Sequence, residues 1–411
     1  MSKLDELLAE LCPEEVPFKK VKDVYTRLKG TPITAGKMKE IACDDGEIRI
    51  FAGGKTVIDA HEKDIPKANI ICVPAVLVQS RGVIDVVYYE KPFTFKNEMW
   101  AYTADDAVSV KFLYYVLKNN IQTFRDAASG MGSLPQISLK VTEEFMLPVP
   151  PLEVQREIVH ILDSFTLLTA ELTAELTARK KQYGYYRDNL LSFSGNADVK
   201  NVPLGDIAKF VYGYTDKAKE TGSARFVRIT DISEDGRLNP YDAKYVDLTE
   251  ESKKYLLAKG DLLLARTGAT YGKTLYFESD EPAVYASFLI KIILDNSIIK
   301  NRYYWHFSKS SLYWKQAERY VSKAGQQQFN TNAVSRVKVP VPSLEVQDKI
   351  IYVLDNFDAI CTDLNIGLPA EIEARQKQYE FYRDSLLTFA ETGQMISQTD
   401  RQTDRQTDRQ N

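Results

Sequence analysis

Hydrophobic residues recur at helical spacing in two long stretches of the chain. The first stripe is formed by Val154, Ile158, Ile161, Leu162 and Phe165 and is continued by Leu172, Leu176, Tyr183, Tyr186 and Leu190. The second stripe is formed by Val346, Ile350, Leu354, Phe357 and Cys361. A continuous helix over 152–192 would be roughly 60 Å long at about 1.5 Å per residue. An amphipathic helix of this length needs a partner, so the two stripes predict an antiparallel pair within the chain. Gly367 and Pro369 predict a break in the second helix near 364–369.

The hydrophobic pattern elsewhere alternates with turn residues and is mostly typical of strands. In the first half, strands are expected in EIRIFAGG, ANIICVPAVLVQ, GVIDVVYYE and EMWAY, between residues 47 and 102. In the second half they are expected in RFVRITDI, AKYVDL, GDLLLART, KTLYF and FLIKIIL. Helices are predicted at 2–11, 110–124 and 301–320, and polar loops at 132–138 and 324–330.

The two halves repeat one another. PPLEVQREIVHILDSF aligns with PSLEVQDKIIYVLDNF at an offset of 192 residues, and RKKQYGYYRDNLLSF aligns with RQKQYEFYRDSLLTF at 196. Self-similarity of this density indicates a duplicated unit. The predicted fold class is α+β, with two pseudo-repeated α/β domains separated by two long antiparallel helices. The predicted boundaries are 1–147 and 196–340 for the domains, 148–195 and 341–391 for the helical segments, and 392–411 for a QTDR-repeat tail expected to be disordered.

Composition and charge narrow the class of protein. The chain has 411 residues, 44% of them hydrophobic, and no apolar run long enough to span a membrane. Four cysteines without C-x-x-C spacing and three histidines far apart in sequence predict a reducing, cytoplasmic location and no metal site. The net charge is −4, but residues 199–340 contain 22 Lys and Arg against 16 Asp and Glu, a net of +6. This excess permits phosphate contacts in the second domain.

No catalytic motif is present in the sequence. GATYGKT at 268–274 is one residue too short for a P-loop, and the only Pro-Pro pair lacks the flanking residues of an amino-methyltransferase tetrad. The pair Glu251 and Lys253 is common in charged loops and does not indicate a nuclease. No catalytic residue is therefore predicted.

Several loops carry residues suited to nucleic-acid binding. Glycines beside basic residues allow close approach to a phosphate, and amide side chains can read adenine through two hydrogen bonds. Each such residue, taken singly, could equally be an ordinary turn or solvated polar group, and the duplication of the arrangement is the stronger signal. The predicted DNA-binding residues of the first domain are Lys55, Ser80, Arg81, Gly82, Ser133 and Gln136. Those of the second domain are Arg225, Arg228, Arg266, Thr267, Gly268, Lys273, Gln326, Gln327, Gln328 and Asn330.

The paired helical motifs, together with GDLLLARTGATYGK, resemble the conserved regions of type I restriction–modification specificity subunits. The run TAELTAELTA at 169–178 is similar to the spacer repeat of the type IC group. The resemblance implies two target-recognition domains that each read half of a bipartite, asymmetric duplex DNA site. It also implies helices that dock two methyltransferase subunits, and restriction or translocase subunits that join them. S-adenosylmethionine, ATP and Mg²⁺ would be bound by those partners and not by this chain.

The four-residue repeat has a mechanical interpretation. Four residues change a helix by about 6 Å and about 40°, which is comparable with one or two base pairs of DNA. The repeat could equally be good helix-forming filler. Two other functions stay open at this point: a coiled-coil scaffold or adaptor without DNA specificity, and a stand-alone DNA-modifying enzyme. Salt-dependent binding with a bipartite footprint distinguishes the leading interpretation from the adaptor.

Overall fold

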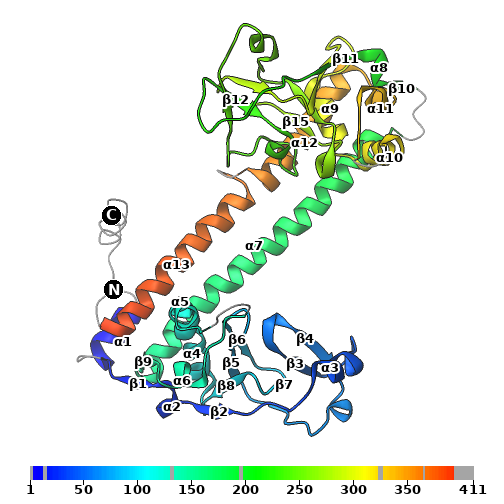
Figure 1. Cartoon of the computed structure of the whole chain (residues 1–411). Coiled ribbons are helices and arrows are strands. Elements are labelled where there is room, and N and C mark those ends of the chain that lie inside the picture. The colour runs from blue at the N-terminus through cyan, green and yellow to red at the C-terminus, as the bar shows by residue number, and fades with distance from the viewer. Residues whose placement is uncertain are drawn as a thin grey trace. The chain divides into compact units, whose positions relative to one another are not determined.

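The computed structural model describes residues 3–12, 16–129, 134–193, 198–322, 327–363 and 366–392 (Figure 1). The chain divides into two compact units: unit 1 comprises 1–170 and 374–411, and unit 2 comprises 171–373. The predicted tail from 393 onward lies outside the described residues. None of the described helices is both long enough and apolar enough to cross a bilayer.

Unit 1 contains an α/β domain with three small sheets, one of which is the antiparallel pair of β1 and β9. Its four-stranded sheet has the order β2-β8-β5-β6, and its three-stranded sheet has the order β4-β3-β7 with β3 and β7 parallel. The central strand β5 is buried at every position, which explains the apolar run Ala75–Val78, and its last residue, Gln79, is a buried polar one. The strands are β1 (Phe18–Lys20), β2 (Thr26–Leu28), β3 (Ile48–Phe51), β4 (Val57–Ala60), β5 (Ala75–Gln79), β6 (Asp85–Tyr89), β7 (Phe93–Phe95), β8 (Trp100–Thr103) and β9 (Met146–Pro148). The helices are α1 (Lys3–Leu11), α2 (Val21–Val24), α3 (Ala35–Ile41), α4 (Ala107–Asn119), α5 (Ile121–Asp126) and α6 (Leu139–Glu143), with short 3₁₀ turns η1 (Gly53–Lys55) and η2 (Glu62–Asp64).

Unit 2 contains a second domain with the same strand topology. Its sheets have the orders β11-β17-β14-β15 and β13-β12-β16, with β12 and β16 parallel and the central strand β14 buried throughout. The strands are β10 (Lys200–Pro203), β11 (Ala208–Tyr212), β12 (Ala224–Val227), β13 (Tyr245–Val246), β14 (Leu262–Ala265), β15 (Thr274–Tyr276), β16 (Ala283–Tyr285), β17 (Leu289–Leu294) and β18 (Lys338–Val341). The helices are α8 (Leu204–Ile207), α9 (Asn301–Ser308), α10 (Ser311–Tyr320) and α11 (Thr331–Val334), with 3₁₀ turns η3 (Ile229–Asp231), η4 (Ser252–Tyr255) and η5 (Gly268–Thr270).

The matching strand orders confirm the duplication, with some corrections to the expected elements. Nine strands were not anticipated, and all of them except β11 have only three or four residues and little periodicity: β1, β2, β4, β7, β9, β10, β11, β16 and β18. The single helix expected over 301–320 was wrong: α9 ends at Ser308 and α10 begins at Ser311. Ser310 causes this break, because its side chain accepts the backbone N–H of Tyr313 at 3.2 Å and so starts a new helix.

The long helices form as the hydrophobic stripes predict. Helix α7 (Leu152–Ser192) is one helix of 41 residues. Its counterpart is divided into α12 (Leu344–Thr362) and α13 (Leu368–Thr392), which confirms the predicted break. A Cβ added at Gly367 would lie 2.6 Å from the carbonyl oxygen of Ala359, so the break requires glycine there. The second copy is longer than the first by four residues. These residues therefore fall beside the break between α12 and α13 and do not extend one helix.

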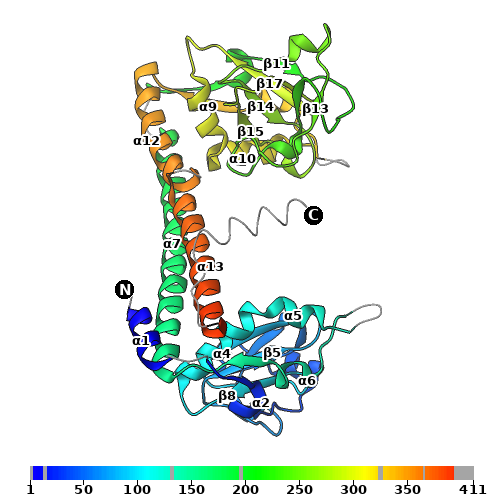
Figure 2. The same ribbon diagram turned by 90° about the vertical axis from the view of Figure 1, so that its left-hand side faces the viewer.

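Aromatic stacking shows that the long helices pair antiparallel. In unit 1, Phe165 of α7 stacks on Tyr382 of α13 with ring centroids 5.2 Å apart, and Figure 2 shows these two helices side by side. In unit 2, Phe357 of α12 stacks on Tyr186 of α7 at 5.4 Å. Phe165 and Phe357 are equivalent in the repeat, and so are Tyr186 and Tyr382. The same pair of equivalent residues therefore stacks in both units, with the roles of the two helices exchanged.

Candidate nucleic-acid interface

A tight turn after β14 brings several of the predicted DNA-binding residues of unit 2 together. Gly268 adopts a positive φ of 71°, which turns the chain sharply after Thr267. The loop before α11 pairs with this turn: Thr267 forms a β-bridge with Gln328, and the N–H of Phe329 donates to the carbonyl of Arg266 at 2.7 Å. Gln327 and Gln328 are exposed beside it. The turn and the loop, separated by about sixty residues in sequence, therefore form one surface.

Arg266 lies between two exposed aromatic rings on this surface. Its guanidinium carbon is 5.2 Å from the ring centroid of Tyr212 and 5.5 Å from that of Phe288. Its Nε donates to the carbonyl of Ser287 at 3.1 Å, while its terminal nitrogens have no hydrogen bond to any described residue. The rings hold the guanidinium plane and leave its forked end available for an acceptor pair. Sequence reasoning missed Tyr212 and Phe288, whose exposure, at 41% and 52%, is the signal that only the structure supplies.

The same turn occurs in unit 1 after β5. Gly82 has a φ of 78°, its N–H donates to the carbonyl of Pro135 at 2.9 Å, and Arg81 forms a β-bridge with Gln136. Arg81 and Gln136 are exposed, as is Lys55. The 3₁₀ turn that carries Lys55 lies against this surface, since a Cβ on Gly82 would be 3.6 Å from the Cα of Gly54. The correspondence between the SRGVID and ARTGATYGK segments is therefore a correspondence in space.

Several other predicted residues are buried or are bonded within the protein. Arg225 is 6% exposed, donates to the carbonyl of Asn239 and belongs to the smaller sheet. Arg228 pairs with Asp231 at 2.8 Å and with Asp242 at 3.3 Å. The remaining predicted positions with structural contacts are Ser80, buried and bonded to the carbonyl of Glu98; Thr267, 3% exposed; and Asn330, which caps α11. Ser133 and Gln326 lie outside the described residues.

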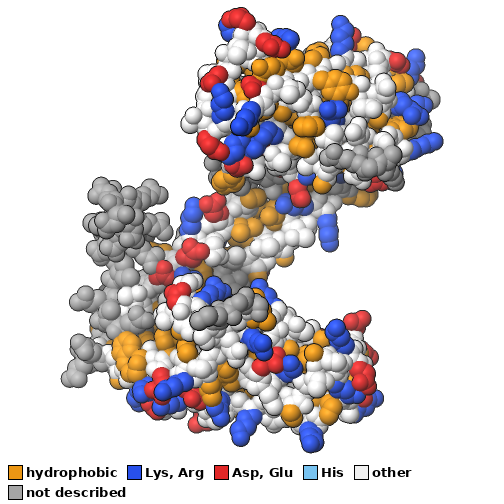
Figure 3. Space-filling model, in the orientation of Figure 1, with side chains coloured by type: hydrophobic (Ala, Val, Ile, Leu, Met, Phe, Trp, Pro, Cys, Tyr) orange, Lys and Arg blue, Asp and Glu red, His pale blue; other side chains and the backbone are white. Residues whose placement is uncertain are grey.

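The charge of unit 2 is concentrated near this surface in sequence. Residues 301–340, which contain α9, α10, α11 and the glutamine loop, carry seven Lys and Arg against a single acidic residue, Glu318. On the face shown in Figure 3, Lys and Arg side chains of unit 2 alternate with hydrophobic and acidic ones. A basic segment next to exposed amides suits phosphate contacts beside base contacts.

A buried ion-pair network joins the domain of unit 2 to its long helices. Asp355 on α12 accepts from Arg302 Nε at 2.8 Å and lies 2.7 Å from Nε2 of His306, both on α9. The other ring nitrogen of His306 is 3.1 Å from the hydroxyl of Tyr183 on α7. Burial lowers the pKa of His306 to about 4, although Asp355 opposes the shift. His306 is therefore a neutral, fixed connector at physiological pH.

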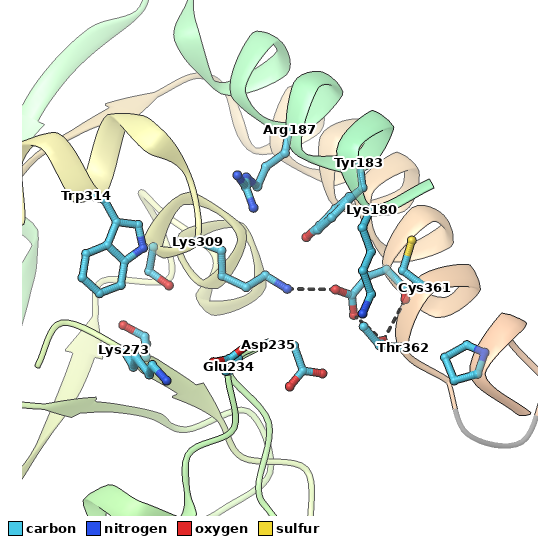
Figure 4. Close-up of a pocket in the computed structure, with 15 residues that line it drawn as sticks. Lys180, Tyr183, Arg187, Glu234, Asp235, Lys273, Lys309, Trp314, Cys361 and Thr362 are labelled. Atoms are coloured by element: carbon cyan, nitrogen blue, oxygen red, sulfur yellow. Dashed lines mark hydrogen bonds and ion pairs between the residues drawn. The ribbon is translucent and has the colours of Figure 1, made fainter. Parts of the chain in front are cut away.

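A second acid, Asp358, lies one turn further along α12. Its carboxylate accepts from Lys309 Nζ at 2.8 Å and from Arg237 at 2.5 Å, and it is 1% exposed. Asp358 and Lys309 line a cavity of about 460 Å³ between the domain and the helices, and Lys273 lines it too (Figure 4). Lys273 thus faces this cavity and not the turn of Arg266.

Unit 1 uses a simpler version of the same connection. Asp163 of α7, the repeat equivalent of Asp355, pairs with Lys111 Nζ at 2.8 Å and accepts from the hydroxyl of Tyr115 at 2.5 Å. Lys111 and Tyr115 lie four residues apart on α4, as Arg302 and His306 do on α9. Each domain is therefore fixed to a long helix through an acid at an equivalent position.

Comparison with known proteins places these features in context. The family model for the type I restriction modification DNA specificity domain matches residues 13–179 and again 196–374. The chain is 33% identical to the specificity subunit of the type I restriction enzyme EcoR124I/EcoR124II of Escherichia coli, covering 69% of this chain and 72% of that protein. It is 31% identical to a putative type I specificity subunit of Mycoplasma pneumoniae, covering 90% and 97%. The crystal structure of a type I restriction–modification S subunit from M. genitalium has a similar fold, with a TM-score of 0.58, 17% identity and coverage of 93% and 97%.

Proposed function

We propose, from the premise that the chain belongs to the type I restriction–modification DNA specificity family, that its two domains each read one half of a bipartite, asymmetric duplex DNA site. The observation that carries the proposal is the duplicated turn: Thr267, next to Arg266, is bridged to Gln328 in unit 2, and Arg81 is bridged to Gln136 in unit 1. Two turns of one construction but different side chains suit two unlike half-sites.

The roles of these residues follow from their chemistry. The forked end of an arginine can donate two hydrogen bonds to guanine, and a glutamine amide can pair with adenine. Exposed basic residues suit phosphates, which position the protein without reading sequence. These residues are Lys55 in unit 1 and Lys315, Arg319, Arg336 and Lys338 in unit 2. Arg225, Arg228 and Ser80, whose polar groups are bonded internally, would act by supporting the recognition surfaces.

The chain would work as the non-catalytic member of a larger complex. Names of its relatives describe specificity subunits of type I restriction enzymes, and a subunit of a type I system studied for complex assembly shares the fold with a TM-score of 0.55 at 14% identity. We expect two methyltransferase subunits and restriction or translocase subunits as partners, with S-adenosylmethionine, ATP and Mg²⁺ bound by them. Such a complex would act in the cytoplasm, where its DNA is.

The experiment that tests DNA reading compares two substitutions at one position. Arg266→Lys keeps the positive charge but loses the planar fork, whereas Arg266→Ala loses both. Both variants should relax base selection in one half-site, and the preferred base should lose about 5- to 150-fold in discrimination. Selection from a randomised duplex library by the assembled methyltransferase complex measures this.

The matched variant Arg81→Lys should relax the other half-site and leave the first unchanged. Uniform weakening on all sequences, with Arg266→Lys behaving as wild type, would mean that Arg266 contacts phosphate only. An absence of any salt-dependent, bipartite footprint would instead favour an adaptor without DNA specificity.

A further inference from the structure

Three side chains of unit 1 with metal-ligating atoms converge beside the smaller sheet. One ligand atom from each of Cys43, Asp45 and His61 lies within 4.8 Å of the other two. Cys43 and Asp45 follow α3, whereas His61 follows β4. They meet because β3 and β4 pair antiparallel with Ile48 opposite Ala60, which brings the residues before β3 next to those after β4. The sequence predicted no metal site. Cys43 and His61 are brought together by the β3–β4 hairpin, and their spacing in the sequence does not reveal that contact.

The ring of His61 is oriented as the ring of a metal-bound histidine usually is. Its Nδ1 lies 2.7 Å from a carboxylate oxygen of Glu47, and its Nε2 faces Asp45 at 3.5 Å. Glu47 is itself held, because its other oxygen accepts the backbone N–H of Glu62 at 2.9 Å. A histidine that ligates a metal through one nitrogen commonly donates its other N–H to a carboxylate, which fixes the tautomer and the ring direction.

The separation between His61 Nε2 and Asp45 fits a zinc shell. Zinc binds histidine nitrogen and carboxylate oxygen at about 2.0–2.1 Å, so two such ligands at the tetrahedral angle lie about 3.3 Å apart. The 3.5 Å between His61 Nε2 and Asp45 is close to this value and longer than the distance of about 2.9 Å usual for a hydrogen bond. Cys43 and His61 also line an open recess of about 620 Å³, which provides a path for an ion to enter.

We propose that Cys43, Asp45 and His61 bind a single Zn²⁺ ion, with water as the fourth ligand and Glu47 as the group that orients His61. The mixed sulfur, nitrogen and oxygen set suits zinc better than Mg²⁺ or Ca²⁺, which prefer oxygen alone. On binding, the Cys43 thiol releases its proton to solvent and the thiolate forms the bond to the metal.

The position of the site explains what the ion would contribute. The smaller sheet and α3 enclose a cluster of only eight buried residues: Ile33, Met38, Ile41, Ile48, Ile50, Ala52, Ala60 and Ile65. Small cores of this kind are often stabilised by a disulfide or a metal. The ion would tie the segment after α3 to the end of β4, and so hold the hairpin that leads through η1 to Lys55.

The test uses the full chain and Zn²⁺ itself as the probe. Iodoacetamide labels free thiols, and mass spectrometry reports labelling at Cys43 and Cys72 in the same sample. We expect Zn²⁺ to slow labelling of Cys43 at least about tenfold, because a zinc-bound thiolate is a much poorer nucleophile. Labelling of the exposed Cys72 should not change, and EDTA should restore labelling of Cys43. Equal labelling of Cys43 with and without Zn²⁺ would overturn the proposal.

A variant of the histidine tests the ligand set without removing the thiol. His61→Ala should abolish the protection of Cys43 and lower the zinc content by one ion per chain. The matched control His160→Ala, at an exposed histidine on α7, should keep both. Protection that persists in His61→Ala would also refute the site, and circular dichroism establishes that each variant is folded. The wild-type labelling result stands even if His61→Ala fails to fold.

Discussion

Replacing Asp358 with asparagine should destabilise unit 2 by about 3–5 kcal/mol at neutral pH, the usual cost of removing one partner from a buried ion pair. Asp358 is 1% exposed and is the acid between Lys309 and Arg237. Lys309 is 12% exposed in its side chain and lies 3.4 Å from the ring centroid of Trp305. Asparagine would leave the cations of Lys309 and Arg237 close together with no carboxylate between them.

The pH dependence of the wild-type protein follows from the same geometry. Burial alone would raise the pKa of Asp358, but Lys309 and Arg237 lower it to about 2. Because the folded pKa lies below the unfolded value of about 3.9, this carboxylate contributes stability above about pH 4. That contribution, about 2.5 kcal/mol by linkage, is lost as the pH falls towards 2.

The variant should show a different signature. Burial lowers the pKa of Lys309 to about 8 even with Asp358 beside it, and without the carboxylate the pKa of Lys309 should fall further. The unfolded variant then binds more protons than the folded one over a wider range, so its stability rises with pH. The deficit of Asp358→Asn relative to wild type should therefore shrink between about pH 5 and pH 8.

Urea titration measures the loss of unfolding free energy if the fluorescence signal comes from unit 2. Two of the three tryptophans, Trp305 and Trp314, lie in unit 2, so a Trp100→Phe background isolates their fluorescence. The double variant Asp358→Asn, Lys309→Met should cost less than the sum of the single variants by at least about 2 kcal/mol, since methionine removes the unpaired charge. Additivity within about 0.5 kcal/mol, or a deficit independent of pH, would refute the argument.

Three further outcomes are expected. Gln347→Ala should lower the free energy of unfolding by about 3 kcal/mol, and the repeat equivalent Gln155→Ala by about 1 kcal/mol. The reason is that the Gln347 amide makes three hydrogen bonds at 2.9 Å, whereas the Gln155 amide makes one at 2.8 Å. Equal losses of stability in thermal denaturation would contradict this expectation. Gly236→Ala should destabilise the protein by at least about 2 kcal/mol, because its φ is +76° and a Cβ would lie 2.6 Å from a carbonyl oxygen. Gly54→Ala should destabilise it by only about 1 kcal/mol, because Gly54 has a similar φ of +70° but open space around it. Deleting one TAEL from 169–178 should change the preferred distance between half-sites and leave the sequence of both half-sites intact. The reason is that four residues shorten the helix by about 6 Å and rotate it by about 40°. An unchanged distance in library selection would refute the spacer hypothesis.

Much of the fold could be predicted because its signals are local or duplicated. The stripes through Phe165 and Phe357 predicted the long helices, and Gly367 predicted their one interruption. Strands β5 and β14 could be recognised from continuous apolar runs. The short strands β4, β7 and β16 could not, since they are stabilised by pairing with distant partners, not by their own periodicity.

The candidate site was predicted in outline and not in detail. A glycine close to an arginine correctly predicted the turns at Arg81 and Arg266, because few residue types other than glycine tolerate a positive φ. Whether a side chain points outward depends on what packs against it. Ser80 is turned inward, and Arg228 is paired with an acid. The rings flanking Arg266 come from Tyr212 at the end of β11 and from Phe288 in the turn before β17.

The sequence by itself determined the duplication, the helical stripes, the break at Gly367 and the positions of the turns at Gly82 and Gly268. Periodicity and backbone restrictions act over a few residues, so they are readable without a fold. Only the tertiary structure decided which polar groups meet: Asp355 with His306, Asp358 with Lys309, and Cys43 with His61. These contacts join residues between 18 and about fifty positions apart, and their energies depend on burial and distance, which exist only once the chain has folded.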